Sequence, residues 1–327
     1  MDAVFIVDKS RGPTSHDVVS AMRRVLSTKK VGHAGTLDPM ATGVLVVAVG
    51  EATKLVAYLS AHDKAYEATI RFGVATSSLD AEGEETDRVA VDRSIVDALG
   101  DLSTARDHPG IQAAFAIERA RTSQVPPNVS AIKVDGVASH ARARRGEDFA
   151  LPPRDVVVRA IEIVGARREP PELDVTLDVG KGYYVRSFAR DLAASLGTVA
   201  HLTALARTRS GTFDLSRAID GASLMAARRG DVAIAERTRS MAIPMREAVC
   251  ASLPTLTLDA EATLRARQGK RLYDTDGLAA FPIDAPIAWL SPEGALVAIG
   301  AVAIEEGARV GRVVRGFQDS AESTSVT

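Results

Sequence analysis

The apolar residues near the N-terminus follow a strand pattern, then a helical pattern, then a strand pattern again. The continuous apolar run from Val4 to Val7 predicts a buried strand. A helix is predicted next, with Thr14 or Ser15 as its N-cap, because the following apolar residues share one helical face: Val18, Val19, Met22, Val25 and Leu26. The run 44–49 predicts a second buried strand, and the segment 51–60 predicts a helix.

The pattern between residues 65 and 241 predicts a mixed sheet with helices. Strands are predicted at 65–72, 129–134, 156–164, 173–179 and 202–209. Helices are predicted at 95–99, 185–196 and 223–241. The acidic segment 76–87 lacks periodicity and is predicted to be a surface loop. The segment 103–117 is extra length to which the pattern assigns no function.

The chain after residue 249 has a different pattern. Short strands are predicted at 255–258, 287–290, 295–304 and 310–314, with a helix near 260–267, and Pro and Gly punctuate this part of the chain. Such spacing predicts a small β-barrel of roughly 65 to 70 residues. The polar residues 318–327 are predicted to be a frayed tail.

The composition indicates a two-domain protein without a disulfide framework. Of the 327 residues 46% are hydrophobic, and 40 Lys and Arg oppose 42 Asp and Glu, for a net charge of -2. The single cysteine, Cys250, suits a reducing compartment. The N-terminus lacks the basic region of a signal peptide, and no apolar run approaches the ~18 residues of a membrane span. A cytoplasmic location away from membranes is expected.

Asp38 is the most informative candidate for chemistry, because it stands between Leu37 and Pro39 in a glycine-containing loop, 32–43, beside a buried strand. A reactive carboxylate can be presented in this way. The simpler alternative is an Asx-type turn, in which Asp38 only bonds a nearby amide. The loop lacks the Gly-x-x-x-x-Gly-Lys-Ser/Thr pattern and no helix follows it, which argues against a nucleoside triphosphate site.

Five segments resemble the motifs of the bacterial tRNA pseudouridine synthase B family, which modifies the T-loop uridine (position 55) of tRNA. In the family's order they are VDKSRGPTSH at 7–16, GHAGTLDPMATG at 32–43, DKAY at 63–66, GYYVR at 182–186 and HLTALARTRSG at 201–211. The resemblance covers nearly all of residues 3–245. The tail is similar, more weakly, to the small RNA-binding barrel of this family, called PUA.

The resemblance implies an α+β fold with a mixed α/β catalytic domain and a smaller RNA-binding domain. The catalytic domain would occupy residues 1–248, with a mixed, mostly antiparallel sheet flanked by helices and an RNA-facing insertion at about 118–150. The PUA-like β-barrel would occupy residues 249–317, followed by the frayed tail.

The implied activity is the isomerisation of uridine in place, without a cofactor or a metal ion. The bond from ribose to the base nitrogen breaks, the uracil turns, and a carbon–carbon bond forms. Asp38 matches the nucleophile. Whether it attacks the sugar carbon, adds to the base ring or assists a glycal route stays open. The target uridine must first be flipped out of the folded T loop.

Two further matches imply catalytic roles. Arg186 matches the arginine that keeps the nucleophile ionised, and Tyr66 matches the tyrosine that stacks on the uracil and is positioned for the later proton removal. Without the surrounding motifs, Arg186 would be interpreted as a surface arginine and Tyr66 as a core tyrosine on a half-buried strand.

Other matches imply contacts with the substrate. His33 matches the residue that fills the space left by the flipped base, Tyr184 and Leu205 match positions that line the base pocket, and Lys9 matches a core lysine near the site. Lys64 and Lys54 are candidate phosphate contacts. The simpler interpretations are an exposed or capping histidine, packing residues and solvated lysines.

Three departures from the family pattern leave the catalytic set intact. Ser10 replaces the proline that usually follows the motif lysine, and this change is expected to loosen the turn. Val129 stands where many members have tyrosine, and Ser139-His140 replaces an aromatic-bearing pattern. Because Val129 and His140 lie in the insertion, its contacts with tRNA are expected to differ from those of other members.

The expected partner is the T arm of tRNA, with no obligatory protein partner and a monomeric state. One alternative is a tRNA-binding or folding factor without catalysis, which the intact Asp38, Tyr66 and Arg186 set argues against. Another is a guide-dependent relative, which the short barrel argues against. Generic glycoside hydrolysis is disfavoured because no second carboxylate accompanies Asp38 in the motifs.

The small net charge hides an uneven distribution. Residues 181–246 hold eleven basic and five acidic residues, a net charge of +6, whereas residues 62–107 hold five basic and eleven acidic ones, a net charge of -6. Residues 1–56 and 118–159 have net charges of +2 and +3. The motif-bearing segments are therefore predicted to form an RNA-facing side.

Overall fold

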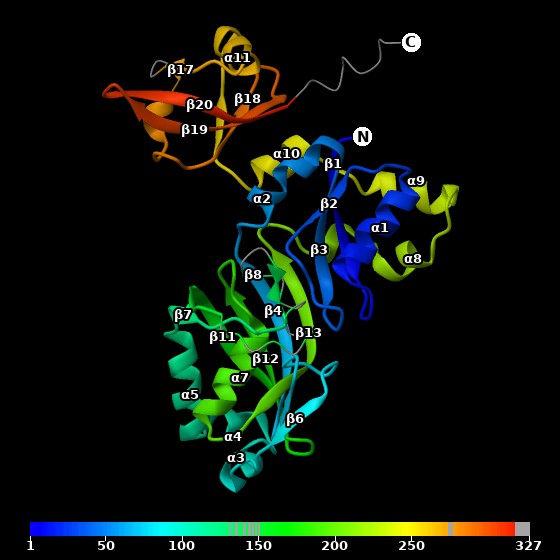
Figure 1. Cartoon of the computed structure of the whole chain (residues 1–327), viewed down its shortest axis with the longest axis vertical. Helices are drawn as coiled ribbons and strands as arrows, with labels where there is room; N and C mark the ends of the chain where they lie inside the picture. The colour runs from blue at the N-terminus through cyan, green and yellow to red at the C-terminus, as the bar shows by residue number, and fades with distance from the viewer. Residues whose placement is uncertain are drawn as a thin grey trace.

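The computed structural model describes residues 1–130, 132–134, 137–139, 142, 145, 147, 149, 151–273 and 277–317. These residues form an elongated molecule, in which a mixed α/β core carries a smaller β-sheet unit at one end (Figure 1). His140 and the tail 318–327 lie outside the described residues.

A long mixed sheet runs through the core. Its described strands follow the order β11-β12-β4-β13-β3-β1-β14, with β15 beside β1 and β2 beside β3. Only the pairs β13–β3 and β1–β14 are parallel among these described neighbours, so the predicted mixed, mostly antiparallel sheet is confirmed. The strands are β1 (Ala3–Lys9), β2 (Val31–Ala34), β3 (Thr42–Val49), β4 (Lys64–Phe72), β11 (Val158–Arg167), β12 (Glu172–Val179), β13 (Ala200–Ser210), β14 (Ala218–Asp220) and β15 (Ile243–Pro244).

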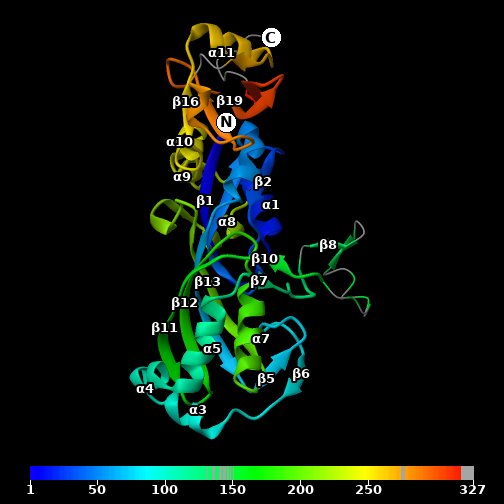
Figure 2. The same ribbon diagram turned by 90° about the vertical axis from the view of Figure 1, so that its left-hand side faces the viewer.

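Helices cover one face of the lower half of this sheet (Figure 2). The helices are α3 (Arg93–Ala98), α4 (Leu102–Asp107), α5 (Pro109–Arg119) and α7 (Val185–Ser195). Their apolar residues share one core with the sheet, and within it the rings of Phe115 and Phe188 meet edge to face with centroids 6.1 Å apart. The segment 103–117 is therefore not surplus length, because α4 and α5 pack on β11 and α7.

The N-terminal helix α1 (Ser15–Val25) confirms the predicted start and buried face. The Thr14 hydroxyl accepts a hydrogen bond from the Asp17 amide, and the Asp17 carboxylate accepts one from the Thr14 amide. The apolar stripe faces the core. The prediction of one helix over 223–241 is wrong, since α8 (Gly221–Ala226) and α9 (Val232–Ser240) are separated near Gly230, whose φ of +85° interrupts helical geometry.

Three further predictions in the first 90 residues need correction. The segment 32–43 is not wholly a loop, because its first residues belong to β2, which pairs with β3. The helix predicted at 51–60 begins as the 3-10 helix η1 (Gly50–Leu55) and continues as α2 (Val56–Leu59). The acidic segment 76–87 is not wholly a loop, because β5 (Val74–Thr76) and β6 (Glu85–Arg88) at its two ends pair as a small hairpin.

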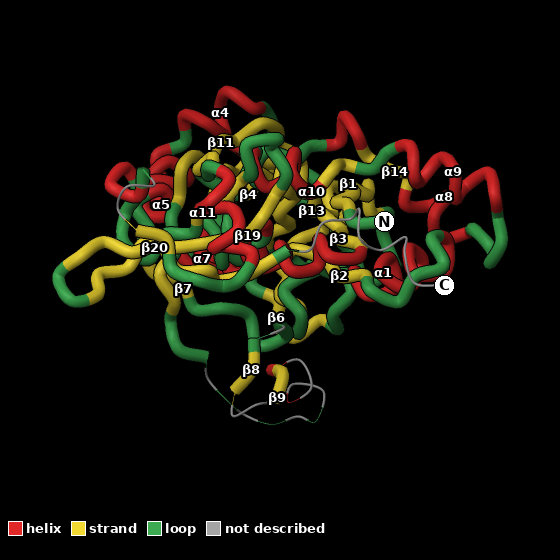
Figure 3. Tube along the Cα trace, turned by 90° about the horizontal axis from the view of Figure 1, so that it is seen from above, coloured by secondary structure: helices red, strands yellow, loops and turns green. Residues whose placement is uncertain are grey.

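The predicted strand 129–134 is reduced to β8 (Lys133–Val134) in the described residues. It pairs with β9 (Val137–Ala138), and both lie to one side of the molecule in the view from above (Figure 3). The nearby stem of this insertion pairs β7 (Ser123–Gln124) with β10 (Arg154–Asp155).

The C-terminal unit is a curled sheet in which the described strands follow the order β16-β18-β19-β20-β17. Its elements are β16 (Thr255–Thr257), α11 (Ala260–Arg267), β17 (Leu272–Tyr273), η4 (Leu278–Ala280), β18 (Ile287–Leu290), β19 (Leu296–Glu305) and β20 (Ala308–Gly316). Trp289 is fully buried against Gly300, where a Cβ atom would lie 2.0 Å from the ring. The strands and helix predicted for this part are therefore present.

An apolar cluster joins this unit to the core. Val4 and Val46 lie on the sheet face opposite the main core, and they share the cluster with Leu290 and Phe317 of the C-terminal unit. The short helix α10 (Met245–Cys250) contributes Ala248 and Val249. In the described part of the chain, no helix has both the length and the apolar character needed to cross a membrane.

Candidate active site

A cavity of about 290 Å³ lies between the loop after β2 and the first turn of α7. It is lined by six of the residues singled out from the sequence: Asp38, Lys64, Tyr66, Tyr184, Arg186 and Leu205. These side chains come from four segments that are far apart in the sequence. β4 and β13 are neighbouring strands of the sheet, and α7 packs against both of them.

Asp38 and Arg186 form a two-pronged ion pair at this cavity. Arg186 Nε lies 2.9 Å from Asp38 Oδ2, and Arg186 Nη2 donates to Asp38 Oδ1 at 3.2 Å. This fork geometry is specific to arginine and fixes the direction of the carboxylate. The Arg186 side chain is 5% exposed and the Asp38 side chain 33% exposed, so the carboxylate is the more accessible partner.

Two backbone carbonyls and a second acid complete the surroundings of Arg186. Its Nη1 donates to the Ser78 carbonyl at 2.8 Å, and its Nη2 donates to the Val129 carbonyl at 2.9 Å. The carboxylate of Asp80 lies 4.0 Å from Arg186 Nε. The motifs contain no second carboxylate beside Asp38, and Asp80, which lies outside the motifs, brings one to the same arginine.

Burial and the ion pair have opposite effects on Asp38. Burial raises the pKa of the Asp38 carboxyl above its ordinary value, and the Arg186 guanidinium opposes this rise. The nearby Asp80 adds to the rise, because a second negative charge disfavours ionisation. Arg186 thus stabilises the ionised form of Asp38, which burial and Asp80 disfavour.

Lys9 holds the loop through hydrogen bonds to its backbone and does not line the cavity. Its buried ammonium donates to the carbonyls of Ser10, Pro39 and Ala41 at 3.0, 3.1 and 2.7 Å. Burial lowers the pKa of Lys9 to about 8. Ser10, which departs from the family pattern, contributes its backbone carbonyl to this set, so the missing proline does not remove a contact.

Arg207 is a buried site residue that the sequence analysis did not single out. Its guanidinium donates to the carbonyls of Val44 and Gly35 at 2.7 and 3.0 Å and so ties β13 to both ends of the loop. Gly43 has a φ of +94°, and a Cβ atom there would lie 2.3 Å from the Arg207 carbonyl oxygen. The last glycine of the signature is therefore required by the close approach of two strands.

The remaining predicted residues differ in position. Tyr66 on β4 pairs with Arg207 on β13 and is mostly buried. Lys64 is also buried, and its ammonium donates to the carbonyls of Ser60 and His62 at 3.0 and 2.7 Å. His33 lies on β2, is not in the cavity lining, and its buried Nδ1 has no hydrogen-bond partner among the described residues.

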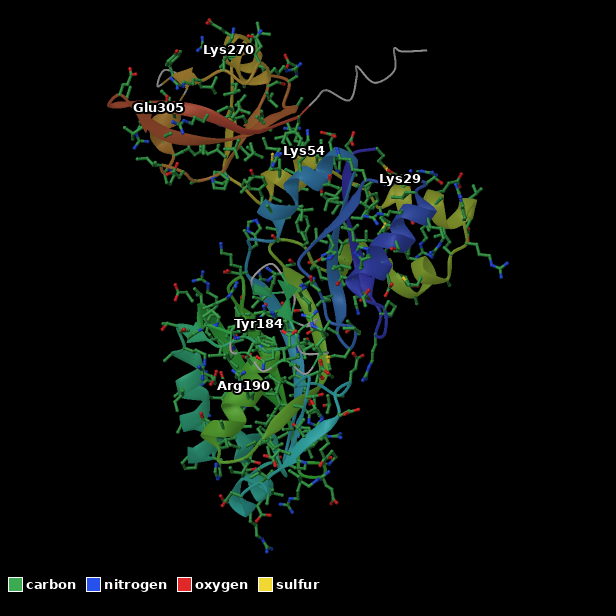
Figure 4. The ribbon with its side chains drawn as sticks, viewed as in Figure 1. Lys29, Lys54, Tyr184, Arg190, Lys270 and Glu305 are labelled. Carbon is green, nitrogen blue, oxygen red and sulfur yellow. The ribbon has the colours of Figure 1, made fainter. Side chains whose placement is uncertain are left out.

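Lys54 lies far from the cavity, at the junction with the C-terminal unit (Figure 4). Its ammonium donates to the Gly316 carbonyl at 3.0 Å and lies 5.4 Å from the centroid of the Phe317 ring. The described residues contain no group of three or more His, Cys, Asp or Glu arranged to hold a metal ion.

Two solved assemblies share this fold. A chain in the structure of an H/ACA RNP bound to a substrate RNA containing 2'-deoxyuridine aligns with a TM-score of 0.66 and 23% identity, covering 97% of this chain and 85% of that one. A chain in a Cbf5-Nop10-Gar1 complex aligns with a TM-score of 0.66 and 24% identity, covering 97% and 84%. The class of fold is thus one that also occurs in RNA–protein assemblies.

Sequence comparison narrows this class to a family. Residues 23–185 match the TruB family pseudouridylate synthase (N terminal domain). Relatives called tRNA pseudouridine synthase B are 43% identical over 83% of this chain and 85% of the protein in Cutibacterium acnes, and 41% identical over 91% and 94% in Thermobifida fusca. The chain therefore belongs to the TruB family of pseudouridylate synthases.

Proposed function

We propose that this protein isomerises uridine in tRNA to pseudouridine, and that its target is the T-loop uridine at position 55. The observation that carries the proposal is the Asp38–Arg186 ion pair at a cavity of about 290 Å³. That volume is at the small end of the ~300 to 1,000 Å³ typical of ligand sites and suits one extruded base. The relatives called tRNA pseudouridine synthase B support the same substrate.

Asp38 serves as the nucleophile. The fork of Arg186 holds its carboxylate in one orientation and favours its ionised form, so that Asp38 can act on the flipped nucleotide. The glycosidic bond to N1 breaks, the uracil turns within the cavity and the new bond joins C5 to the ribose. C5 then loses its hydrogen as a proton and N1 gains a proton, so that the product is an isomer of the substrate.

Tyr66 and Leu205 hold the base while it turns. Both line the cavity, and Tyr66 offers a ring for stacking and a hydroxyl for the proton removal at C5. Tyr184 also lines the cavity. Lys64 lines the cavity, and its buried ammonium, held by two carbonyls, adds positive charge there for the extruded nucleotide. His33 does not line the cavity, so it contacts the RNA left behind and not the extruded base.

Catalysis and tRNA binding are assigned to different parts of the chain. Residues 1–248 form the catalytic domain, the insertion at about 118–150 grips the T arm, and the PUA-like unit at 249–317 binds a more distant part of the tRNA. The protein acts as a cytoplasmic monomer, without a metal ion, a cofactor or an obligatory protein partner.

The test is a reaction of the purified protein with an unmodified tRNA transcript, followed by mapping of pseudouridine. Product at position 55 without added protein or guide RNA is the expected result. Tight binding of the transcript without product would contradict the proposal and favour an RNA-folding factor. Product only after a guide RNA is added would favour a guide-dependent enzyme.

A further inference from the structure

Gln124 is a buried glutamine that bonds both backbone groups of one residue in the cavity wall. It lies on β7, at the base of the insertion, and is 2% exposed. The Tyr184 amide donates to Gln124 Oε1 at 2.9 Å, and Gln124 Nε2 donates to the Tyr184 carbonyl at 3.1 Å. Among the standard side chains, only Asn and Gln offer an amide donor and a carbonyl acceptor together, and Asn is one methylene shorter.

The position of Tyr184 gives these bonds their importance. Tyr184 is the N-cap of α7, and its own side chain makes no capping hydrogen bond. Its carbonyl also accepts from the Phe188 amide at 3.1 Å, which begins the helix. Gln124 therefore fixes the residue at which α7 starts, and Arg186 lies two residues later on the first turn.

Further bonds tie the same two segments together. The Ser187 hydroxyl donates to the Val125 carbonyl at 2.8 Å, and Arg190 Nη2 donates to the same carbonyl at 3.0 Å. Figure 4 shows Tyr184 and Arg190 in the same part of the core. Arg186 also donates to the Val129 carbonyl. Residues 124, 125 and 129 of the insertion therefore all contact the first turns of α7.

We propose that Gln124 is a positioning residue for the reaction, which acts through Tyr184 to hold Arg186 in its fork with Asp38. The inference rests on the proposed function and extends it, because it connects the RNA-facing insertion to the catalytic ion pair. Removal of the side-chain amide would let the start of α7 shift. A small shift would break the two-pronged geometry while leaving most of the RNA-binding surface unchanged.

The test compares Gln124→Met, which keeps the volume but removes both bonds, with wild type and with Gln112→Met on the exposed face of α5 as a matched control. Three quantities are measured: the single-turnover rate on a tRNA transcript, the dissociation constant for that transcript, and the hydrogen exchange of the Tyr184 amide. Gln124→Met is expected to lower the rate at least tenfold, to change the dissociation constant less than threefold and to speed the exchange. The control is expected to change none of them.

A second variant covers the case in which Gln124→Met does not fold. Gln124→Glu keeps the acceptor for the Tyr184 amide but, when ionised, cannot donate to the Tyr184 carbonyl, and a rate at least threefold lower is expected. A folded Gln124 variant with the wild-type rate, or with unchanged Tyr184 exchange, would overturn the inference while the proposed function stands. A wild-type protein that makes no pseudouridine would instead overturn the proposed function.

Discussion

Arg186 in the cavity and Lys54 at the junction with the C-terminal unit make similar sets of contacts in different surroundings. Each cation pairs with a carboxylate and donates to a backbone carbonyl that is distant in the sequence. Arg186 meets Asp38 and the Val129 carbonyl. Lys54 meets Glu51, three residues before it, and the Gly316 carbonyl. The Arg186 side chain is 5% exposed, whereas the Lys54 side chain is 29% exposed.

The two carboxylates respond in opposite directions. Hydrogen bonds from Lys30 and Lys54 lower the pKa of Glu51, while burial raises the pKa of Asp38 despite its arginine. For these two acids, burial decides the direction of the pKa shift more than the presence of a cation does. At the junction, the Lys54–Glu51 pair is a partly solvated surface contact. In the cavity, Arg186 holds the Asp38 carboxylate in surroundings that disfavour its negative charge.

The largest expected effect comes from Arg186→Lys. A lysine keeps the positive charge but lacks the fork, so it cannot reach Asp38 and both carbonyls together. The single-turnover rate should fall roughly 100-fold, the scale at which loss of one preorganised electrostatic group slows catalysis. A folded variant within threefold of the wild-type rate would show that the two-pronged geometry is not needed.

A smaller effect is expected from acid. Because the folded pKa of Asp38 is raised, its carboxylate becomes protonated as pH falls through a value higher than that of an ordinary aspartate. Protonation removes the nucleophilic carboxylate, so the single-turnover rate is expected to fall by up to tenfold for each pH unit below that pKa. Single-turnover rates across the pH range in which the protein stays folded measure this limb. A rate that stays constant down to about pH 4, the ordinary range of aspartate, would contradict the account.

The smallest effect is expected from Lys54→Met. The Lys54–Glu51 pair is partly solvated, and such pairs contribute about 1 kcal/mol or less to the free energy of unfolding. The apolar cluster that includes Leu290 and Phe317 carries the contact between the core and the C-terminal unit. Denaturant unfolding measures the change, and a loss above about 2 kcal/mol would show that the junction depends on its charges.

The sequence predicted the regular elements well where periodicity was strong. The stripe of α1 and the buried strands β1 and β3 are as expected, because each has one face or both faces in the core. The helices α4 and α5 were missed because α4 has only six residues and the segment that forms α5 begins with Pro109 and Gly110, a pair typical of turns. The break at Gly230 inside the segment 223–241 was missed because the arginine-rich face continues across it.

The site was predicted only in part for a different reason. The resemblance to the family pointed to Asp38, Tyr66 and Arg186, and these three side chains line one cavity. Asp80, Gln124 and Arg207 were not singled out, because a buried polar residue whose partner is distant in the sequence follows no local period: Asp80 lies near the Arg186 side chain, and Gln124 and Arg207 bond distant backbone groups. Each stands out only when its partner in space is known.

The most direct test of the central claim compares Asp38→Asn with wild type on an unmodified tRNA transcript. The substitution keeps the size of the side chain and removes the nucleophilic carboxylate. Asp38→Asn is expected to bind the transcript with an affinity close to wild type and to form no pseudouridine at position 55. Turnover within tenfold of wild type would contradict the role of Asp38 as the nucleophile.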